Sequence, residues 1–302
     1  MKKNIKPSIT IGIPALDESA NIVLLLENIF NQKYKSCFLS EVIVVDDGSS
    51  DGTSLKVRSY KNKKIRLIIH KERKGIVKSQ NDIVKNATSD ILVMLDADVL
   101  PRNQLFIEEI IKPITLGGAS LVGAAVASLP GDGFVERALV ASTEFKKELY
   151  ENLKNQDNLY LCHGRARAMS KKLYAELHWV ENVPEDAYSY LYAKRKGFLF
   201  SYADRAVVLY KSPVTITDHA KQRIRFLDSK NVLGLYFSKE ILEREYSIPL
   251  FLIFKVIISF IIKHPVEILI FLLINLYTKF LFSQKNIDHS KHMVAISSKV
   301  LI

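Results

Sequence analysis

The expected fold is decided by the sequence ILVMLDAD, which spans Ile91–Asp98 and ends an apolar run in two carboxylates. Pro101 follows closely, so the run has the length and boundaries of a strand buried on both faces of a parallel sheet. Open α/β sheets bind ligands beyond the carboxyl ends of their strands, where Asp96 and Asp98 would lie. Two carboxylates this close repel each other unless a cation or a hydrogen-bond network offsets their charge. The alternative is a solvated acidic turn.

The composition is that of a globular protein with anionic partners. The 302 residues suffice for one large α/β domain with an appendage, or for two small domains. Lys and Arg number 43 against 32 Asp and Glu, and the net charge of +11 suits phosphorylated substrates or acidic lipids. Nucleic acid is not expected, because no reading motif accompanies the charge. Cys37 and Cys162 form no zinc pattern and are expected to be structural, in a reducing compartment.

Strand-like and helical patterns alternate through the first hundred residues, which predicts a doubly wound, mostly parallel α/β sheet. The expected strands are Ser8–Pro14, Glu41–Val45, Ile65–His70 and Ile91–Leu95. The expected helices are one with the apolar face Ile22, Leu25, Leu26 and Ile29, one beginning near Thr53, and one over 76–86. Asp17 and Ser19 offer N-caps to the first of these helices.

A second acidic loop, DDGSSDGT at Asp46–Thr53, follows the strand Glu41–Val45. Carboxylates, glycines and hydroxyls at a strand end can bind the base and ribose of a nucleotide, although a turn followed by a helix cap is the alternative. The ends of parallel strands share one edge of the sheet, so this loop and Asp96–Asp98 would lie side by side. That coincidence favours a ligand site.

Three segments together resemble the nucleotide-binding half of family 2 glycosyltransferases of the GT-A fold. They are IPALDE at Ile13–Glu18, VVDDGS at Val44–Ser49 and MLDAD at Met94–Asp98. The resemblance implies that Asp47 contacts the base of a nucleotide-sugar donor, and it places Pro14, Glu18 and Asp46 beside it. It also implies that Asp96 lies near the ribose and sugar and that Asp98 ligates Mg²⁺ or Mn²⁺, cations that commonly bind through carboxylates and substrate phosphates.

Two departures from the family pattern concern the donor side. The usual Asn-Glu after the first strand is Asp17-Glu18 in this chain. The common Gly-Lys-Ala segment is Gly75-Ile76-Val77, so Lys74 or Lys78 would have to supply the missing lysine.

The next hundred residues contain the acceptor half that the resemblance implies. Expected elements are a strand at Ala119–Val126, an amphipathic helix from Phe134 to Leu153, and a strand pair at Phe198–Ala203 and Ala206–Tyr210. The segment Leu161–Ala166 stands where the family has a loop beneath the acceptor sugar, and His163 either contacts the acceptor or is structural.

Glu185 and Asp186 open a helix that is expected to continue to about Lys196. A carboxylate at a helix N-terminus is stabilised by the helix dipole and stays ionised, as a general base requires. The resemblance implies that Asp186 is the catalytic base and that Glu185 belongs to the same acidic pair. The alternative is an acidic helix cap without catalytic function.

The segment QRIRF at Gln222–Phe226 resembles the Gln-x-x-Arg-Trp motif of membrane-bound, often processive, synthases in this family, with Phe226 in place of Trp. The resemblance implies that Gln222 and Phe226 lie near the acceptor and that Arg223 or Arg225 lies near the diphosphate, which a guanidinium suits. A basic helix face at a membrane surface is the alternative. His219 could add a metal contact.

The last part of the chain has two apolar segments, Ile248–Ile262 and Val266–Phe282. Each is shorter than the ~20 residues that comfortably span a bilayer. A transmembrane hairpin, two helices in the plane of the membrane surface, and soluble core all remain open. The expected organisation is a catalytic domain at 1–228 (donor half about 1–100, acceptor half about 101–228), an amphipathic connector at 229–247, apolar helices at 248–282 and a basic cytosolic tail at 283–302.

The resemblance implies inverting transfer of a sugar from a nucleotide diphosphate, with UDP preferred, to a lipid-linked or polysaccharide acceptor. Asp186 would deprotonate the acceptor hydroxyl, while Asp98 and a divalent cation neutralise the leaving diphosphate. The protein is expected at a membrane with its catalytic domain in the cytoplasm. The alternatives are a non-catalytic membrane scaffold of the same fold and a nucleotidyltransferase, for which the glycine-rich opening loop is lacking.

Overall fold

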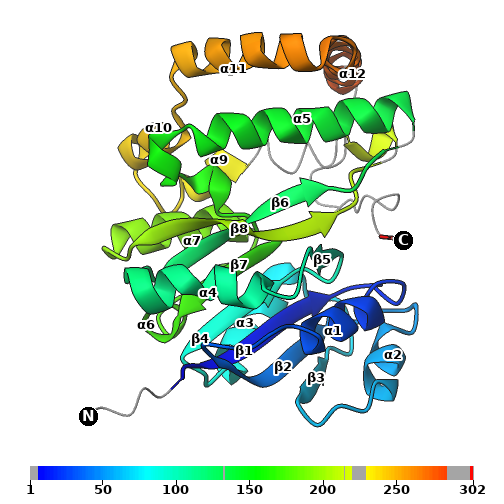
Figure 1. The fold of residues 1–302 in the computed structure, drawn as a ribbon, viewed down its shortest axis with the longest axis vertical. Coiled ribbons are helices and arrows are strands. Elements are labelled where there is room, and N and C mark those ends of the chain that lie inside the picture. Colours follow the sequence, from blue (N-terminus) through cyan, green and yellow to red (C-terminus); the bar gives the residue numbers. More distant parts are fainter. Residues whose placement is uncertain (1–5, 132, 214, 220–228, 284–299, 302) are drawn as a thin grey trace. The chain divides into compact units, whose positions relative to one another are not determined.

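The computed structural model describes residues 6–131, 133–213, 215–219, 229–283 and 300–301 (Figure 1). The chain divides into two units. The first consists of 1–126, 157–209 and Leu301, and the second of 127–156 and 210–300 together with Ile302.

The first unit is built on a sheet with the strand order β3-β2-β1-β4-β7-β6-β8-β5 (Figure 1). The strands are β1 (Ser8–Ala15), β2 (Phe38–Asp46), β3 (Ile65–Ile69), β4 (Ile91–Leu95), β5 (Val99–Pro101), β6 (Leu121–Ser128), β7 (Ala166–Ser170) and β8 (Phe200–Tyr210). β1 pairs in parallel with β2 and β4, and β2 with β3, while β7 is antiparallel to β4 and β6. The predicted mixed α/β fold with a mostly parallel sheet is therefore confirmed, and the ends of β2 and β4 lie on either side of β1.

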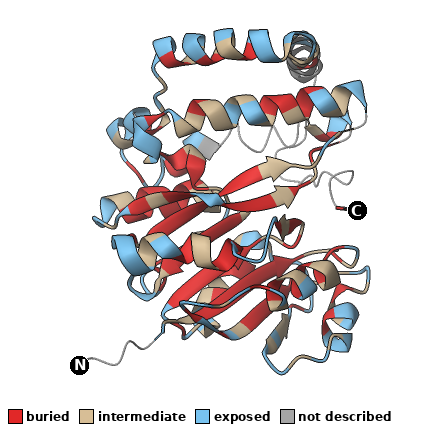
Figure 2. Cartoon of the chain, viewed as in Figure 1, coloured by how far each residue is buried: buried red, intermediate tan, exposed pale blue. Residues whose placement is uncertain are grey.

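Helices supply the rest of the first unit. They are α1 (Ile22–Phe30), α2 (Thr53–Ser59), α3 (Ile76–Asn86), α4 (Phe106–Gly117), α6 (Lys171–Tyr174) and α7 (Glu185–Arg195), with a 3₁₀ turn at Leu159–Leu161. β4 is buried at every position, and β1 and β2 are buried over their carboxyl-terminal halves (Figure 2). α1 buries Ile22, Leu25, Leu26 and Ile29, the predicted apolar face. The core therefore fixes the strand ends at which the acidic loops begin.

Two local predictions were wrong. α1 begins after Asn21, and Asp17 does not cap it, because the Oδ1 of Asp17 accepts the backbone N–H of Ser50 at 2.9 Å. Ser19 likewise donates its backbone N–H to Asp51 in place of capping. The expected strand pair near 200 is one continuous strand, β8, since the polar pair Asp204-Arg205 stays extended with both side chains exposed.

The second unit consists of helices. They are α5 (Phe134–Glu151), α9 (Ser229–Leu233), α10 (Lys239–Tyr246), α11 (Leu250–Lys263) and α12 (Pro265–Ser283), with a 3₁₀ turn at Lys154–Gln156. α11 and α12 both pack on α5, and α11 runs alongside it (Figure 1). α11 buries Leu252, Val256 and Phe260, and the ring of Phe260 meets that of Phe145 edge-on at 5.5 Å.

The opposite side of α11 is apolar and exposed. We call Phe251, Phe254, Ile258 and Ile262 the exposed stripe; these side chains are 72%, 62%, 61% and 77% exposed. Among the described residues one stretch, Lys239–Lys263, is long and apolar enough to cross a membrane by length and composition. It consists of α10 and α11, and α11 alone has 14 residues, fewer than the ~20 of a comfortable span.

Candidate functional site

Asp46 is the first carboxylate of the loop after β2, and its two oxygens have different surroundings. Asp46 is 1% exposed, and its Oδ1 accepts the backbone N–H of Ser49 at 2.9 Å. Its Oδ2 is buried and has no hydrogen-bond partner within the described part of the chain. A buried acceptor without a donor is costly, so this oxygen is suited to an N–H or O–H group of a ligand.

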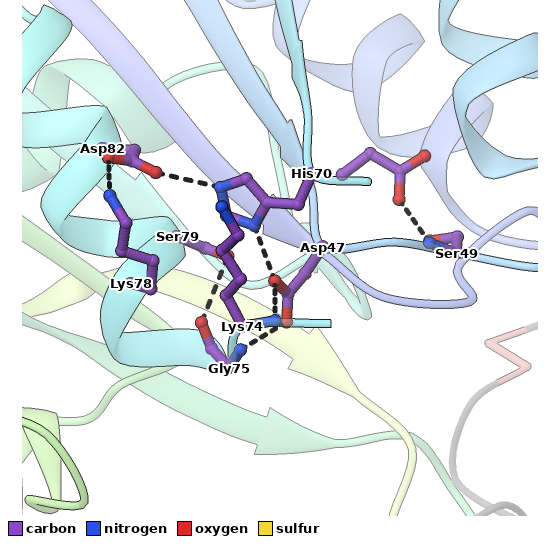
Figure 3. A network of polar contacts seen from close by, with 9 residues as sticks. Asp47, Ser49, His70, Lys74, Gly75, Lys78, Ser79 and Asp82 are labelled. Atoms are coloured by element: carbon purple, nitrogen blue, oxygen red, sulfur yellow. Dashed lines mark hydrogen bonds and ion pairs between the residues drawn. The ribbon is translucent and has the colours of Figure 1, made fainter. Parts of the chain in front are cut away.

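Asp47, in contrast, is fully engaged within the chain (Figure 3). Its Oδ1 lies 2.7 Å from the Nδ1 of His70 and accepts the backbone N–H of Lys74 at 2.8 Å. Its Oδ2 accepts the backbone N–H of Gly75, also at 2.8 Å. Asp47 therefore anchors the segment that leads into α3, and its predicted contact with a base remains a prediction.

The same network continues onto α3. The Nε2 of His70 lies 2.9 Å from the Oδ2 of Asp82, whose other oxygen forms an ion pair with Lys78 (Figure 3). Sequence reasoning missed both His70 and Asp82, because a histidine after a short strand and an aspartate within a helix match no motif. Lys74 and Lys78 are both exposed at the start of α3, within one turn of each other.

The end of β1 meets this loop from the other side. Pro14 is buried and paired in register with Val45, one residue before Asp46. The backbone N–H of Glu18 donates to the Oγ1 of Thr53 at 2.9 Å, and its Oε2 accepts the side-chain amide of Asn21 at 2.8 Å. The structure thus brings the predicted donor-side residues of β1 and β2 to one edge of the sheet.

The end of β4 holds a concentration of negative charge. Burial, followed by the charges of Asp98 and Glu185, raises the pKa of Asp96 to about 7, while Arg165 and Arg167 act in the opposite direction. The backbone N–H of Asp96 donates to the carbonyl of Arg165 at 2.9 Å. The predicted Asp-x-Asp pair is therefore joined by an acid from α7, far away in the sequence.

The loop that contains His163 lies against the start of α7. A Cβ atom added to Gly164 would lie 2.9 Å from the Oε1 of Glu185. Asp186 occupies the first turn of α7, partly buried, with its Oδ1 accepting the backbone N–H of Ala187 at 2.7 Å. Glu185 is thus brought near Asp96, and Asp186 lies beside the loop that contains His163, although these residues come from separate segments.

The remaining predicted residues belong to the second unit or lie outside the described residues. His219 belongs to the second unit, where its ring meets that of Phe271 at 6.4 Å. The segment with Gln222, Arg223, Arg225 and Phe226 lies outside the described residues. Their predicted roles stay predictions. Burial raises the pKa of the Cys162 thiol to about 12, which agrees with a structural cysteine.

The acidic cluster provides carboxylates for a cation without forming a complete metal centre. Among the described residues, no three His, Cys, Asp or Glu side chains surround one ion position. Mg²⁺ and Mn²⁺ usually bind through one or two carboxylates and complete their shell with substrate phosphates. Asp96 and Asp98, whose mutual repulsion a cation would relieve, fit that pattern.

Comparisons with known proteins identify the family and the fold. The family model described as Glycosyl transferase family 2 matches residues 10–177. Glycosyltransferase AglE of Haloferax volcanii is 32% identical over 123 residues, which are 40% of each chain. In Escherichia coli, the UDP-Glc:alpha-D-GlcNAc-diphosphoundecaprenol beta-1,3-glucosyltransferase WfgD is 28% identical over 90 residues, 30% of this chain and 34% of WfgD. The matches thus span well under half the length of either relative.

A solved structure extends the likeness to most of the chain. Mannosyltransferase PcManGT from Pyrobaculum calidifontis, in complex with GDP-Man and Mn²⁺, has a TM-score of 0.62 at 19% identity. The likeness covers 93% of this chain and 82% of that one, and shows the fold. Since the family model spans more than half of the residues, the chain belongs to glycosyl transferase family 2.

Proposed function

We propose that this protein is an inverting glycosyltransferase that moves a sugar from a nucleotide diphosphate to an acceptor hydroxyl. The observation that carries the proposal is the convergence of Asp96 and Asp98 after β4 with Glu185 on the first turn of α7. Donor-side and acceptor-side acids predicted from separate motifs thereby share one site. WfgD is named for a UDP-sugar and PcManGT was solved with a GDP-sugar, and we expect UDP first.

Asp186 is the proposed general base. It stands in the first turn of α7, beside the loop that contains Gly164. There it takes the proton of the acceptor hydroxyl as the acceptor oxygen bonds to the anomeric carbon. The bond from that carbon to the diphosphate breaks on the opposite face, so the configuration inverts.

The donor is proposed to lie along the ends of β1, β2 and β4. Buried Asp46 offers its unpaired Oδ2 to the nucleoside, and exposed Lys74 and Lys78 face anionic groups from the start of α3. Asp98, with Asp96 beside it, would hold Mg²⁺ or Mn²⁺. Such a cation, when bound, supplies positive charge that stabilises a leaving diphosphate.

The acceptor is proposed to be a lipid-linked sugar or a growing polysaccharide at a membrane. The name of WfgD specifies a diphosphoundecaprenol-linked acceptor, which supports an acceptor of this kind. The exposed stripe of α11 supports association with a lipid surface, since four large apolar side chains on one helix face favour leaving water. We place the catalytic residues on the cytoplasmic side.

The deciding experiment is sugar transfer by an Asp186→Asn variant, measured with a panel of UDP- and GDP-sugars and Mn²⁺. Loss of a general base should lower kcat by about 10²- to 10⁴-fold. Nucleotide binding, followed as a thermal shift, should not change. Asp204→Asn, at an exposed position in β8, is the matched control and should keep full activity.

Two results would contradict the proposal. Full transfer by the Asp186→Asn variant would remove Asp186 from catalysis. A wild-type chain that neither transfers sugar nor hydrolyses any donor would instead support a non-catalytic scaffold of the same fold.

A further inference from the structure

A buried arginine lies close enough to Asp96 to lower the pKa of its carboxyl group, yet it forms no hydrogen bond to a carboxylate among the described residues. Arg167 on β7 is 0% exposed and is paired in register with Met94 of β4 and Gly123 of β6. Its Nη2 donates to the Oε1 of Gln80 at 2.7 Å, while its Nε and Nη1 have no partner within the described chain. Burying a guanidinium with unpaired N–H groups is unfavourable, so an apolar side chain would fill this volume at a lower free energy.

The guanidinium of Arg167 stacks on Trp179, with its central carbon 5.3 Å from the ring centroid. The indole N–H of Trp179 in turn donates to the carbonyl of Glu185 at 3.0 Å and to the Oγ of Ser189 at 2.9 Å. Both acceptors belong to α7. The indole therefore ties Trp179 to the first turns of α7.

Trp179 is also fixed from the donor side. Asn81 of α3 exchanges two hydrogen bonds with the backbone of Trp179, one of 2.7 Å to its carbonyl and one of 3.1 Å from its N–H. Gln80, which accepts the hydrogen bond of Arg167, is the preceding residue on α3. The N-cap of this helix is Gly75, held by Asp47. A continuous set of contacts thus leads from Asp47, in the loop after β2, through α3 and Trp179 to α7.

We propose that Arg167 is a positioning residue that, through Trp179, holds the carboxylates of Glu185 and Asp186 in place relative to the donor-side helix α3. A buried charge that contributes little to stability can still hold its neighbours in one arrangement. The kinetic part of the test rests on the proposed transferase function, but the structural part does not.

The structural test uses amide hydrogen exchange on an Arg167→Met variant. Methionine has a similar length and no charge. The change leaves the Oε1 of buried Gln80 without its donor and removes a positive charge near Asp96, so the melting temperature should fall, and exchange is compared at a temperature where both proteins are folded. Exchange at residues 185–189 should become about tenfold faster or more, because this turn loses its support. Arg195→Met is the matched control: it removes a guanidinium over the ring of Tyr192, at the far end of α7.

The kinetic test uses Arg167→Met, Trp179→Phe and the double variant. Phenylalanine keeps a ring for stacking but lacks the indole N–H that reaches α7. Each single change should lower kcat at least tenfold and leave the donor KM within about twofold, since residues that act only in positioning the base affect the transition state. The double variant should be no worse than either single one, because the two residues act in one series of contacts. Trp179 is the single tryptophan of the chain, so its fluorescence checks the packing in the Arg167→Met variant.

The outcomes separate the two proposals. Unchanged exchange at 185–189 in Arg167→Met, or additive effects of the two substitutions on kcat, would overturn the positioning role. If Arg167→Met does not fold, Trp179→Phe alone decides, and an unchanged kcat in that variant would overturn it. A wild-type protein without transfer activity would contradict the proposed function, and hydrogen exchange would still decide the inference.

Discussion

Asp46 and Asp47 are adjacent in sequence, yet their carboxylates differ in how many hydrogen-bond partners they have. Asp47 has three contacts within the chain, two of them to backbone N–H groups, whereas the Oδ2 of Asp46 has none within the described residues. An Asp47→Asn change leaves one acceptor oxygen where two were used. It should lower the free energy of unfolding by about 1–3 kcal/mol. Urea denaturation would measure the loss.

Asp46→Asn is the matched comparison for this prediction. It can keep the 2.9 Å bond from Ser49 and removes an oxygen that has no partner, so its effect on stability should stay below about 1 kcal/mol. Its effect should appear instead as weaker nucleotide binding. A destabilisation of Asp46→Asn equal to that of Asp47→Asn would contradict the division of roles.

The motifs pointed to the acids at these strand ends, but not to the residues that contact them. Asp46, Asp47 and Asp96 stand at strand ends, which the alternation of apolar and polar runs reveals. The contacts of Asp47 with His70, and of Arg167 with Gln80, join residues 23 and 87 positions apart. No local pattern encodes such contacts. An arginine inside the otherwise apolar strand β7 was the one available signal for Arg167.

At the scale of elements, two glycines show how closely the loops approach the sheet and α7. A Cβ atom on Gly123 of β6 would lie 2.0 Å from the carbonyl oxygen of Leu161. That contact is with backbone, which cannot move without disturbing the 3₁₀ turn at Leu159–Leu161. Gly123→Ala should therefore destabilise the fold by about 1–3 kcal/mol or more, measured by thermal or urea unfolding.

Gly164→Ala is the contrasting change. Its Cβ would meet the end of a flexible side chain, the Oε1 of Glu185 at 2.9 Å, which can rotate away at little cost. Stability should change by less than about 1 kcal/mol, while activity falls because Glu185 is displaced beside the proposed base. If Gly164→Ala loses stability as Gly123→Ala does, the loop is rigid and the proposed effect on Glu185 is wrong.

The observed helices and strands agree closely with the predicted ones where one or both of their faces are apolar. α3 spans Ile76–Asn86 and β4 spans Ile91–Leu95, both as expected. β8 differed, since a charged pair suggested a break that tertiary pairing overrides. The antiparallel β7 was not expected either, because strand direction depends on a return of the chain that no periodicity records.

At the scale of the whole molecule, the open question is what covers the exposed stripe of α11. Phe251, Phe254 and Ile258 lie on the side opposite the buried Leu252, Val256 and Phe260. Lys255 and Lys263 stand on the same helix, and the chain carries a net charge of +11. Apolar residues accompanied by basic ones favour an anionic lipid surface over neutral lipid.

The full-length protein should therefore co-sediment with phosphatidylcholine vesicles that contain phosphatidylglycerol, and less with vesicles that lack it. Changing Phe251, Phe254 and Ile258 together to Asp should weaken binding by about tenfold or more, because three partly inserted side chains are lost. Their exposure in the folded protein predicts an unchanged melting temperature. Leu116→Asp, at a position 79% exposed on α4 of the first unit, is the control and should bind as the wild type does. Equal vesicle binding by the triple variant would contradict the lipid role. If that variant also changes from dimer to monomer, a second protein copy covers the stripe instead of lipid.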